Sequence, residues 1–505
     1  MSIPSLSKLF PVTVLALSVI TFTGCSSDDD DDTGLIKFYN ADLDSPDLFL
    51  TLDEDLDEDD DDEFEATFSG VGFGEASSAT SVPIDDYFYE VAFQDDDSTL
   101  RDDLEIIDEG TLSIDEEELT FVISTGTIEN PVVSIFEIEV EDSDDLIEDD
   151  EFQLQIINVH PTQPAVDVYF SETDETFNEA QLIATANSLV FTDPINLEED
   201  EYIIYLTQPG ETDVIFESDD VSYLFNTQYF LAIRQNDGAG GNPFQLDNMT
   251  FTGLETISDT DSLASIRFYN GVHEHESLPD YSGQIDLSVE NVSTETVVLT
   301  EQLALGDISE TTITSAEDFS LDVTDSANGD FYIESAVFSV PENTARTIFF
   351  YVDEEDVDED DDGVVDEDED GIVDEIEAFV RTVVVDDDTS NGSVETTVSV
   401  VNLADNDDFS FVTVSFVDSD ETLEDVDDVR SVSVGTSSDI SLLNNTYDVF
   451  AVATIDNQEI ILDSFTLTLN EDSNPQFLLL EFDETSPSGF SLNLIDQGEI
   501  DQGEQ

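Results

Sequence analysis

The chain has 505 residues, of which 127 are acidic and 8 are basic, and its formal net charge is −119. This charge repels phosphate, so nucleic acid and anionic membrane surfaces are excluded as partners, and divalent cations are the natural counter-charges. Hydrophobic residues make up 39% of the chain, enough to fill about four cores of roughly 100 residues each. The one Cys excludes an internal disulfide framework and a Cys-based zinc site.

The acidity has a general explanation and a specific one. Near 1 M salt the Debye length falls to about 3 Å, so the general explanation is solvation in a salty medium. The alternative is that some of the acids have a defined task.

Residues 1–24 predict a signal peptide. Lys8 precedes an apolar stretch, residues 9–22, that is too short to span a membrane comfortably. The segment ends in Phe-Thr-Gly-Cys, which resembles a bacterial lipobox with Phe22 in place of the usual Leu. We therefore expect Cys25 to be lipidated with acyl chains such as palmitate that anchor the protein in a membrane. An ordinary secretory signal is the alternative.

The residues after Cys25 bear on location. Ser26, rather than Asp, follows the Cys. By analogy with lipoprotein sorting in Gram-negative bacteria, this predicts the outer membrane, at the cell surface or on the periplasmic face. Residues 25–34 then read as the lipidated Cys with a self-repelling acidic tether.

Residues 35–144 form the first predicted β module. Residues 134–140, SIFEIEV, alternate between apolar and polar side chains, which is typical of a half-buried strand. The acidic loop 53–65 has no Gly at a turn position, so it is expected to be a solvated hairpin tip rather than a calcium loop. The expected strands are 35–39, 48–52, 65–68, 87–93, 119–124 and 132–140.

Residues 152–254 form the second predicted module. The Gly-rich loop 236–243 lacks the Lys and the strand–loop–helix setting of a phosphate cradle, so a flexible loop is expected. His160 lies in an Asn-x-His-Pro turn, where a turn-stabilising hydrogen bond is expected rather than catalysis. The expected strands are 154–159, 165–170, 188–191, 201–207, 214–217 and 228–234.

The third module is predicted at 263–403, with an acidic insertion at 353–377 between strands 347–352 and 377–385. The fourth is predicted at 408–494, followed by a flexible tail, 495–505. Similar openings occur at residues 35, 154, 265 and 411, so the chain reads as four related modules. The predicted fold class is all-β, with tandem Ig-like β-sandwich modules in series after a lipoprotein signal peptide.

The module openings resemble a known family. Residues 156–161, IINVHP, followed by residues 164–169, PAVDVY, resemble the signature of the bacterial domain of unknown function 4397. Residues 229–233, YFLAI, resemble its second signature. The openings at Tyr39-Asn40 and Tyr269-Asn270 fit the same template, whereas the fourth copy has lost the Asn and the Pro. The resemblance implies secreted or surface-anchored β-sandwich modules, and it supplies no catalytic residues.

Two overlapping Asp-rich loops in the insertion predict calcium binding. Carboxylates at alternate positions surround a hard cation with oxygens, and Gly at the sixth position permits the sharp turn. The first loop has Asp358, Asp360, Asp362, Val364, Asp366 and, at the twelfth position, Glu369. The second has Asp366, Asp368, Asp370, Ile372, Asp374 and, at the twelfth position, Glu377. The expected Ca²⁺ site would order a long hairpin and neutralise charge; an acidic low-complexity run is the alternative.

Other chemistry is weakly indicated. His273 and His275 could offer two imidazoles to a transition metal, beside Glu274 or Glu276, but an exposed polar pair in a turn is the simpler interpretation. No nucleophile motif is present, and carboxylate pairs are too abundant to single out a glycosidase dyad.

These patterns predict a monomeric, non-enzymatic outer-membrane or cell-surface lipoprotein with a structural or adhesive role. The alternative is a carbohydrate- or peptide-binding lipoprotein that serves an uptake or hydrolase system. The lack of Trp counts against a sugar platform. The protein or polysaccharide ligand stays open.

Overall fold

The computed structural model describes residues 33–498, except for residues 44, 55–63, 95–103, 142–145, 148–149, 276, 279, 295–296, 357–375, 390–391, 407–408, 420–421, 424–425, 456 and 484. This part of the chain is all-β and forms 34 strands in eight sheets. Two sheets pack against each other in each of four modules, which confirms the predicted tandem β-sandwich architecture. Within the described residues, no helix is long and apolar enough to cross a membrane.

Module 1 packs the sheet β4-β1-β7-β8 against the sheet β3-β2-β5-β6. Its core contains Phe38, Leu50 and Val91, all buried. Strands β2 and β3 form the predicted hairpin, with Asp53 opposite Glu65. The strands are β1 (Thr33–Asp42), β2 (Leu48–Asp53), β3 (Glu65–Thr67), β4 (Thr80–Pro83), β5 (Asp86–Gln94), β6 (Leu104–Ser113), β7 (Glu118–Thr127) and β8 (Asn130–Glu139).

Module 2 packs the sheet β12-β9-β16-β17-β18 against the sheet β11-β10-β13-β14, in which β15 also pairs with β13. The predicted strand at 188–191 is wrong, because two strands that the sequence did not reveal, β11 and β12, flank that segment. The strands are β9 (Glu151–Asn158), β10 (Ala165–Glu172), β11 (Gln181–Asn187), β12 (Ile195–Glu198), β13 (Asp200–Thr207), β14 (Val214–Glu217), β15 (Val221–Tyr223), β16 (Gln228–Gln235), β17 (Phe244–Met249) and β18 (Leu254–Ile257).

Module 3 packs the sheet β22-β19-β25-β26 against the sheet β21-β20-β23-β24. Its long β25–β26 hairpin is the one predicted to flank the acidic insertion. The strands are β19 (Leu263–Asn270), β20 (Gln284–Asn291), β21 (Val297–Ala304), β22 (Thr312–Ser315), β23 (Glu317–Asp325), β24 (Phe331–Val340), β25 (Ala345–Asp356) and β26 (Ile376–Asp386).

Module 4 packs the sheet β30-β27-β33-β34 against the sheet β29-β28-β31-β32. The strands are β27 (Glu395–Asn402), β28 (Phe411–Val417), β29 (Val429–Ser433), β30 (Thr436–Leu443), β31 (Thr446–Ile455), β32 (Gln458–Thr468), β33 (Gln476–Phe482) and β34 (Phe490–Asp496).

The predicted boundary between modules 3 and 4, at 403–408, is wrong. Strand β27 pairs with β30 and, in parallel, with β33, so module 4 begins at Glu395. The run at Phe411, predicted to be the fourth opening, is β28, the second strand of the module. Two further boundaries shift: Thr33 and Gly34 of the predicted tether belong to β1, and β34 extends to Asp496 into the predicted tail.

All four modules share one topology. The first strand of each module pairs in parallel with a strand late in the same module: β1 with β7, β9 with β16, β19 with β25, and β27 with β33. These late strands are nearly continuous apolar runs such as Phe230-Leu231-Ala232-Ile233, as expected of parallel strands that are covered on both faces.

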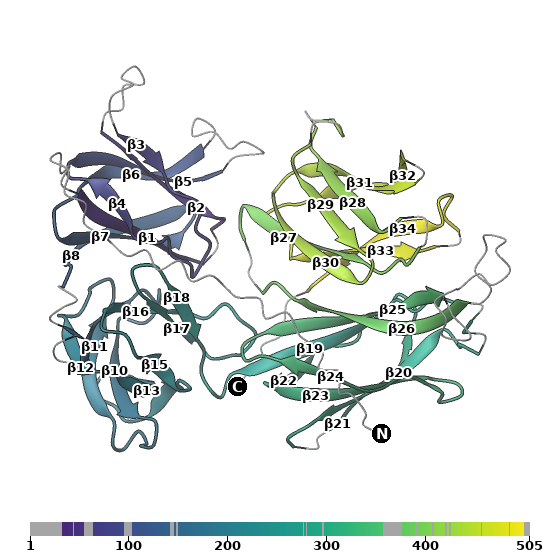
Figure 1. The fold of residues 1–505 in the computed structure, drawn as a ribbon, viewed down its shortest axis with the longest axis horizontal. Helices are drawn as coiled ribbons and strands as arrows, with labels where there is room; N and C mark the ends of the chain where they lie inside the picture. The colour runs from purple at the N-terminus through teal and green to yellow at the C-terminus, as the bar shows by residue number, and fades with distance from the viewer. Residues whose placement is uncertain are drawn as a thin grey trace, which may run out of the picture.

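The second face of each parallel pair is covered by a neighbouring module. Phe121 of module 1 meets Phe230 of module 2 edge to face, with ring centroids 5.4 Å apart. Phe349 of module 3 meets Phe477 of module 4 in the same way, at 5.0 Å. Figure 1 shows the result: module 1 lies over module 2, and module 4 lies over module 3. The four modules thus form two face-to-face pairs.

A buried Asn lies at the end of the first strand in modules 2, 3 and 4, and two residues before the end in module 1. The Asn40 Oδ1 accepts a hydrogen bond from the backbone N–H two residues later, at 3.0 Å, and its Nδ2 donates to the Val71 carbonyl at 2.9 Å. Asn158, Asn270 and Asn402 make the same two contacts, to residues in their own modules. Because the side chain closes a turn on its own backbone, it directs the chain out of the first sheet.

Candidate functional site

Most of the predicted site residues lie outside the described part of the chain. This holds for Cys25 and for the calcium ligands from Asp358 to Asp374. Glu377 is described: it is exposed near the start of β26, opposite Glu355 on β25. Segment 357–375 therefore joins the ends of a paired hairpin, as predicted. Among the described residues, no three His, Cys, Asp or Glu side chains form a group that could hold a metal ion.

The structure gives each described His ring a structural contact. His160 Nδ1 accepts a hydrogen bond from the Thr162 N–H at 3.2 Å, which confirms the predicted turn contact. Burial lowers the pKa of His160, so the ring is neutral and its Nε2 donates to the Pro243 carbonyl.

The other two His residues belong to module 3, and one of them, His273, contacts module 4. Burial, with the charge of His275 adding to it, lowers the pKa of His273 to about 4. The His273 ring packs against Phe482 with a centroid distance of 4.9 Å. His275 Nε2 lies 2.8 Å from Glu354 Oε1. The two His rings lie 6.2 Å apart, centroid to centroid, but among the described residues they are not part of a group of three side chains that could hold a metal ion.

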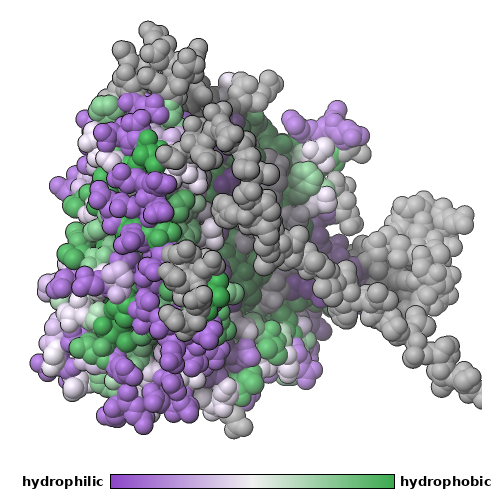
Figure 2. Space-filling view, turned by 60° about the vertical axis from the view of Figure 1, so that its left-hand side comes forward, coloured by the Kyte–Doolittle hydropathy of each residue, from purple (hydrophilic) through white to green (hydrophobic). Residues whose placement is uncertain are grey.

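Three of the eight basic residues of the chain lie in its interior. Lys37, Arg234 and Arg267 are 1%, 5% and 6% exposed. On one outer face of the molecule, hydrophilic side chains are interspersed with small hydrophobic patches (Figure 2). These three basic residues therefore act inside the molecule, whereas Arg346 and Arg381 form ion pairs with more exposed carboxylates.

Arg234 is the centre of a buried polar network between modules 1 and 2. Its Nε lies 2.7 Å from Asp247 Oδ2, and its guanidinium lies over the Phe73 ring of module 1, at 4.8 Å. The Tyr39 hydroxyl of module 1 donates to Asp247 Oδ2 at 2.6 Å. Burial and the charge of Asp247 raise the pKa of Tyr39, so the hydroxyl stays protonated. The network links the two modules through one fully buried carboxylate.

Modules 3 and 4 contain the same kinds of contact, but here the Tyr and the Arg bind two different carboxylates. The Tyr269 hydroxyl of module 3 donates to Glu481 Oε1 of module 4, at 2.7 Å. Arg267 lies 2.9 Å from Asp387 and over the Phe477 ring, at 5.5 Å. Each Arg lies within a mostly apolar strand, and this pattern could have indicated a buried ion pair. Neither pair was predicted from the sequence.

The Gly-rich loop 236–243 connects β16 and β17 within module 2 and contacts module 3. It is therefore not simply a flexible loop. Asn236 and Asn343 exchange side-chain hydrogen bonds at 2.9 and 2.7 Å, and the Gly240 N–H donates to Asn343 Oδ1 at 2.8 Å. A Cβ on Gly238 or Gly240 would lie 2.3 or 2.6 Å from Asn343. Glycine is therefore required for the close approach of the two modules.

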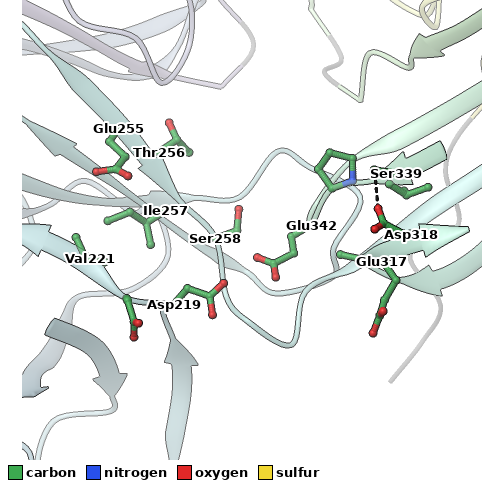
Figure 3. Close-up of a pocket in the computed structure, with 14 residues that line it drawn as sticks. Asp219, Val221, Glu255, Thr256, Ile257, Ser258, Glu317, Asp318, Ser339 and Glu342 are labelled. Carbon is green, nitrogen blue, oxygen red and sulfur yellow. Dashed lines mark hydrogen bonds between the residues drawn. The ribbon is translucent and has the colours of Figure 1, made fainter. Parts of the chain in front are cut away.

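A groove of about 680 Å³ lies beside this junction (Figure 3). Carboxylates of both modules line it: Asp219, Asp220 and Glu255 from module 2, and Glu317, Asp318 and Glu342 from module 3. Apolar side chains, among them Val221, Ile257 and Val340, form the rest of the lining. Burial, with the charges of Asp219 and Asp259 adding to it, raises the pKa of Glu342. This groove is the candidate binding site.

A smaller cavity of about 270 Å³ lies where modules 1, 2 and 4 meet. Asp47, Asp237, Asp388 and Glu395 are among its lining residues. Burial raises the pKa of Glu395 to about 7, and the charges of Asp47 and Asp388 add to the effect. A proton on Glu395 therefore relieves repulsion between modules at neutral pH.

Comparisons with known proteins give no identity. No protein-family model and no curated protein sequence matches the chain, so the resemblance to the domain of unknown function 4397 stays a prediction. Among solved structures, the Bacillus anthracis TIE protein is 8% identical over 90% of this chain and 74% of that chain, with a TM-score of 0.15. The major pilin subunit BcpA of Bacillus cereus is 8% identical over 66% of this chain and 99% of that chain, with a TM-score of 0.13.

A leucine-rich repeat protein from Bacteroides thetaiotaomicron is 9% identical over 39% of this chain and 26% of that chain, with a TM-score of 0.14. Likenesses with TM-scores this low carry no argument about function. The function of this chain is therefore inferred from its own residues.

Replacement of Arg234 by Met is expected to lower the free energy of unfolding of the module 1–2 pair by about 3–5 kcal/mol, because Asp247 stays buried without its cation. Arg381→Met is the matched control. Arg381 also pairs with two carboxylates, but its side chain is 45% exposed, and the expected loss is at most about 1 kcal/mol. Chemical denaturation measures both values, and equal small losses would contradict the role given to Arg234.

Proposed function

We propose that this protein is a non-enzymatic lipoprotein, exposed on a bacterial cell surface, that acts as a rigid acidic structural or binding body. Cys25 would carry the lipid anchor, and residues 26–32 would separate the anchor from the first strand. The observation that carries the proposal is the burial of two module interfaces, which supports a fixed body rather than a loose string of modules.

The interfaces support rigidity through their composition. Each contains aromatic and aliphatic side chains from both modules. Each also includes a Tyr–carboxylate hydrogen bond, which is buried at Tyr39 and partly buried at Tyr269. Relative motion of domains is the ordinary expectation unless the interface is large and hydrophobic. A body of this kind suits presentation of a surface at a distance from a membrane.

Calcium is part of the proposal. The Asp-rich segment 357–375 joins the ends of β25 and β26, whose facing residues Glu355 and Glu377 are both acidic. A Ca²⁺ ion in this segment would neutralise charge at the hairpin end, with an affinity in the roughly 0.1–1 mM range of extracellular modules.

A second candidate function is binding of a peptide or carbohydrate for an uptake or hydrolase system. The groove between modules 2 and 3 favours it, because the groove has the volume of a ligand site and is lined by residues of two fixed modules.

The anchor and the surface location can be tested in bacterial cells. We expect the unaltered protein to fractionate with the outer membrane and to be digested when protease is added to intact cells. Cys25→Ala should release the protein from the membrane fraction, because the lipid has no other attachment point. Protection from protease until the outer membrane is opened would contradict surface exposure, and membrane retention of the variant would contradict the anchor.

Calcium binding can be tested by calorimetric titration of residues 26–505. We expect saturable binding of one or two ions that is lost when Asp362, Asp366 and Asp370 are changed to Asn. The matched control changes Asp57, Asp59 and Asp61 to Asn, which removes equal charge from the other acidic loop and should leave the saturable heat unchanged. Featureless heat, or equal losses in both variants, would mean that the acids bind cations only diffusely.

A further inference from the structure

We infer that the groove between modules 2 and 3 binds an extended basic peptide, which adds as a strand to the free edge of β18. This inference names the partner class for the proposed binding role and rests on that role. It depends on neither the lipid anchor nor calcium.

The first argument is charge. Six carboxylates line the groove, and none of its lining residues is Lys, Arg or His. Figure 3 shows Asp219 of module 2 and Glu342 of module 3 pointing toward each other across it. Two like charges held by separate modules repel each other, and an ammonium or guanidinium group between them would replace that repulsion with two attractive contacts.

The second argument is the strand edge. Strand β18 is the last strand of its sheet, in the order β12-β9-β16-β17-β18, and in the described structure it pairs only with β17. Its residues Glu255, Thr256 and Ile257 line the groove. An unpaired strand edge presents backbone N–H and C=O groups that an extended peptide can pair with. The groove therefore offers main-chain hydrogen bonds as well as charge.

The third argument is the lining of the groove. Three buried apolar residues, Val221, Ile257 and Val340, line the groove together with its carboxylates. A strand that alternates basic and apolar side chains would match both, because successive side chains of a strand point to opposite faces. None of the lining residues is aromatic, so a stacked sugar ring fits the groove less well.

The groove is also preformed. The reciprocal Asn236–Asn343 hydrogen bonds and the close approach at Gly238 and Gly240 hold module 2 against module 3 beside it. Fixed walls lower the entropic cost of binding, so even a short peptide can bind measurably.

The test uses the full chain and a synthetic peptide of alternating Lys and Val residues, titrated calorimetrically at about 0.15 M salt, where the Debye length is about 8 Å. We expect one saturable site. The double variant Asp219→Asn, Glu342→Gln should weaken binding at least about tenfold, since it removes the facing charges. The control double variant, Glu211→Gln with Asp213→Asn, loses the same charge from an exposed loop of module 2 and should bind as the unaltered protein does.

A second peptide separates strand addition from charge attraction. N-methylation of alternate backbone amides preserves the charge of the peptide but removes donors to a strand edge, and we expect it to abolish saturable binding. Equal binding of the two peptides would overturn strand addition. Equal weakening by the groove and control variants, or binding of a Glu–Val peptide, would overturn the site. Either failure leaves the fractionation and protease results on the anchor and surface location unaffected.

Discussion

The parallel strand pair at the centre of each module, covered on both faces, is the constraint on which this architecture depends. One face of β1 and β7 belongs to the core of module 1, with Phe38 and Val122, and the other meets module 2 through Tyr39 and Phe121. Such strands cannot be left half-exposed without opening a large apolar surface to water. The modules must therefore pair, and the buried Asn at or near the end of each first strand fixes where the chain leaves the shared layer.

The charge distribution follows from this pairing. A chain with a net charge of −119 repels itself, so the few cations have most effect where carboxylates would otherwise be buried alone. Arg234 beside Asp247 and Arg267 beside Asp387 occupy such positions. Burial raises the pKa of these carboxyls, and it also raises the pKa of Glu395 and Glu342, for which the described residues show no ion pair. Apolar interfaces thus hold the modules together. The acidic groups that remain at the junctions can be neutralised by protons or by basic partners.

Local patterns in the sequence predicted much of the fold but not the assembly. The alternation in SIFEIEV and the apolar run YFLAI correctly indicated strands. The unbroken apolar run also indicates a strand whose two faces are both covered by protein, and this was not predicted. The fourth opening was misplaced because β27, which ends in Val-Val-Asn, is not followed by a Pro as its counterparts are. The groove could not be predicted, since Asp219 and Glu342 are far apart in the sequence and meet only through the docking of two modules. The Asp-rich loops, by contrast, were visible in sequence alone, and calcium binding there stays a prediction.

Hydrogen exchange measured by mass spectrometry tests the two-sided burial most directly. It compares β7, β16, β25 and β33 with β5, β13, β23 and β31. The second group is also paired on both edges but belongs to the sheets that do not form the two face-to-face interfaces. The account predicts that amides of the first group exchange far more slowly, because they open only when a module pair separates and unfolds. Equal exchange in the two groups would mean that the modules do not hold one another, and the fixed body proposed here would be wrong.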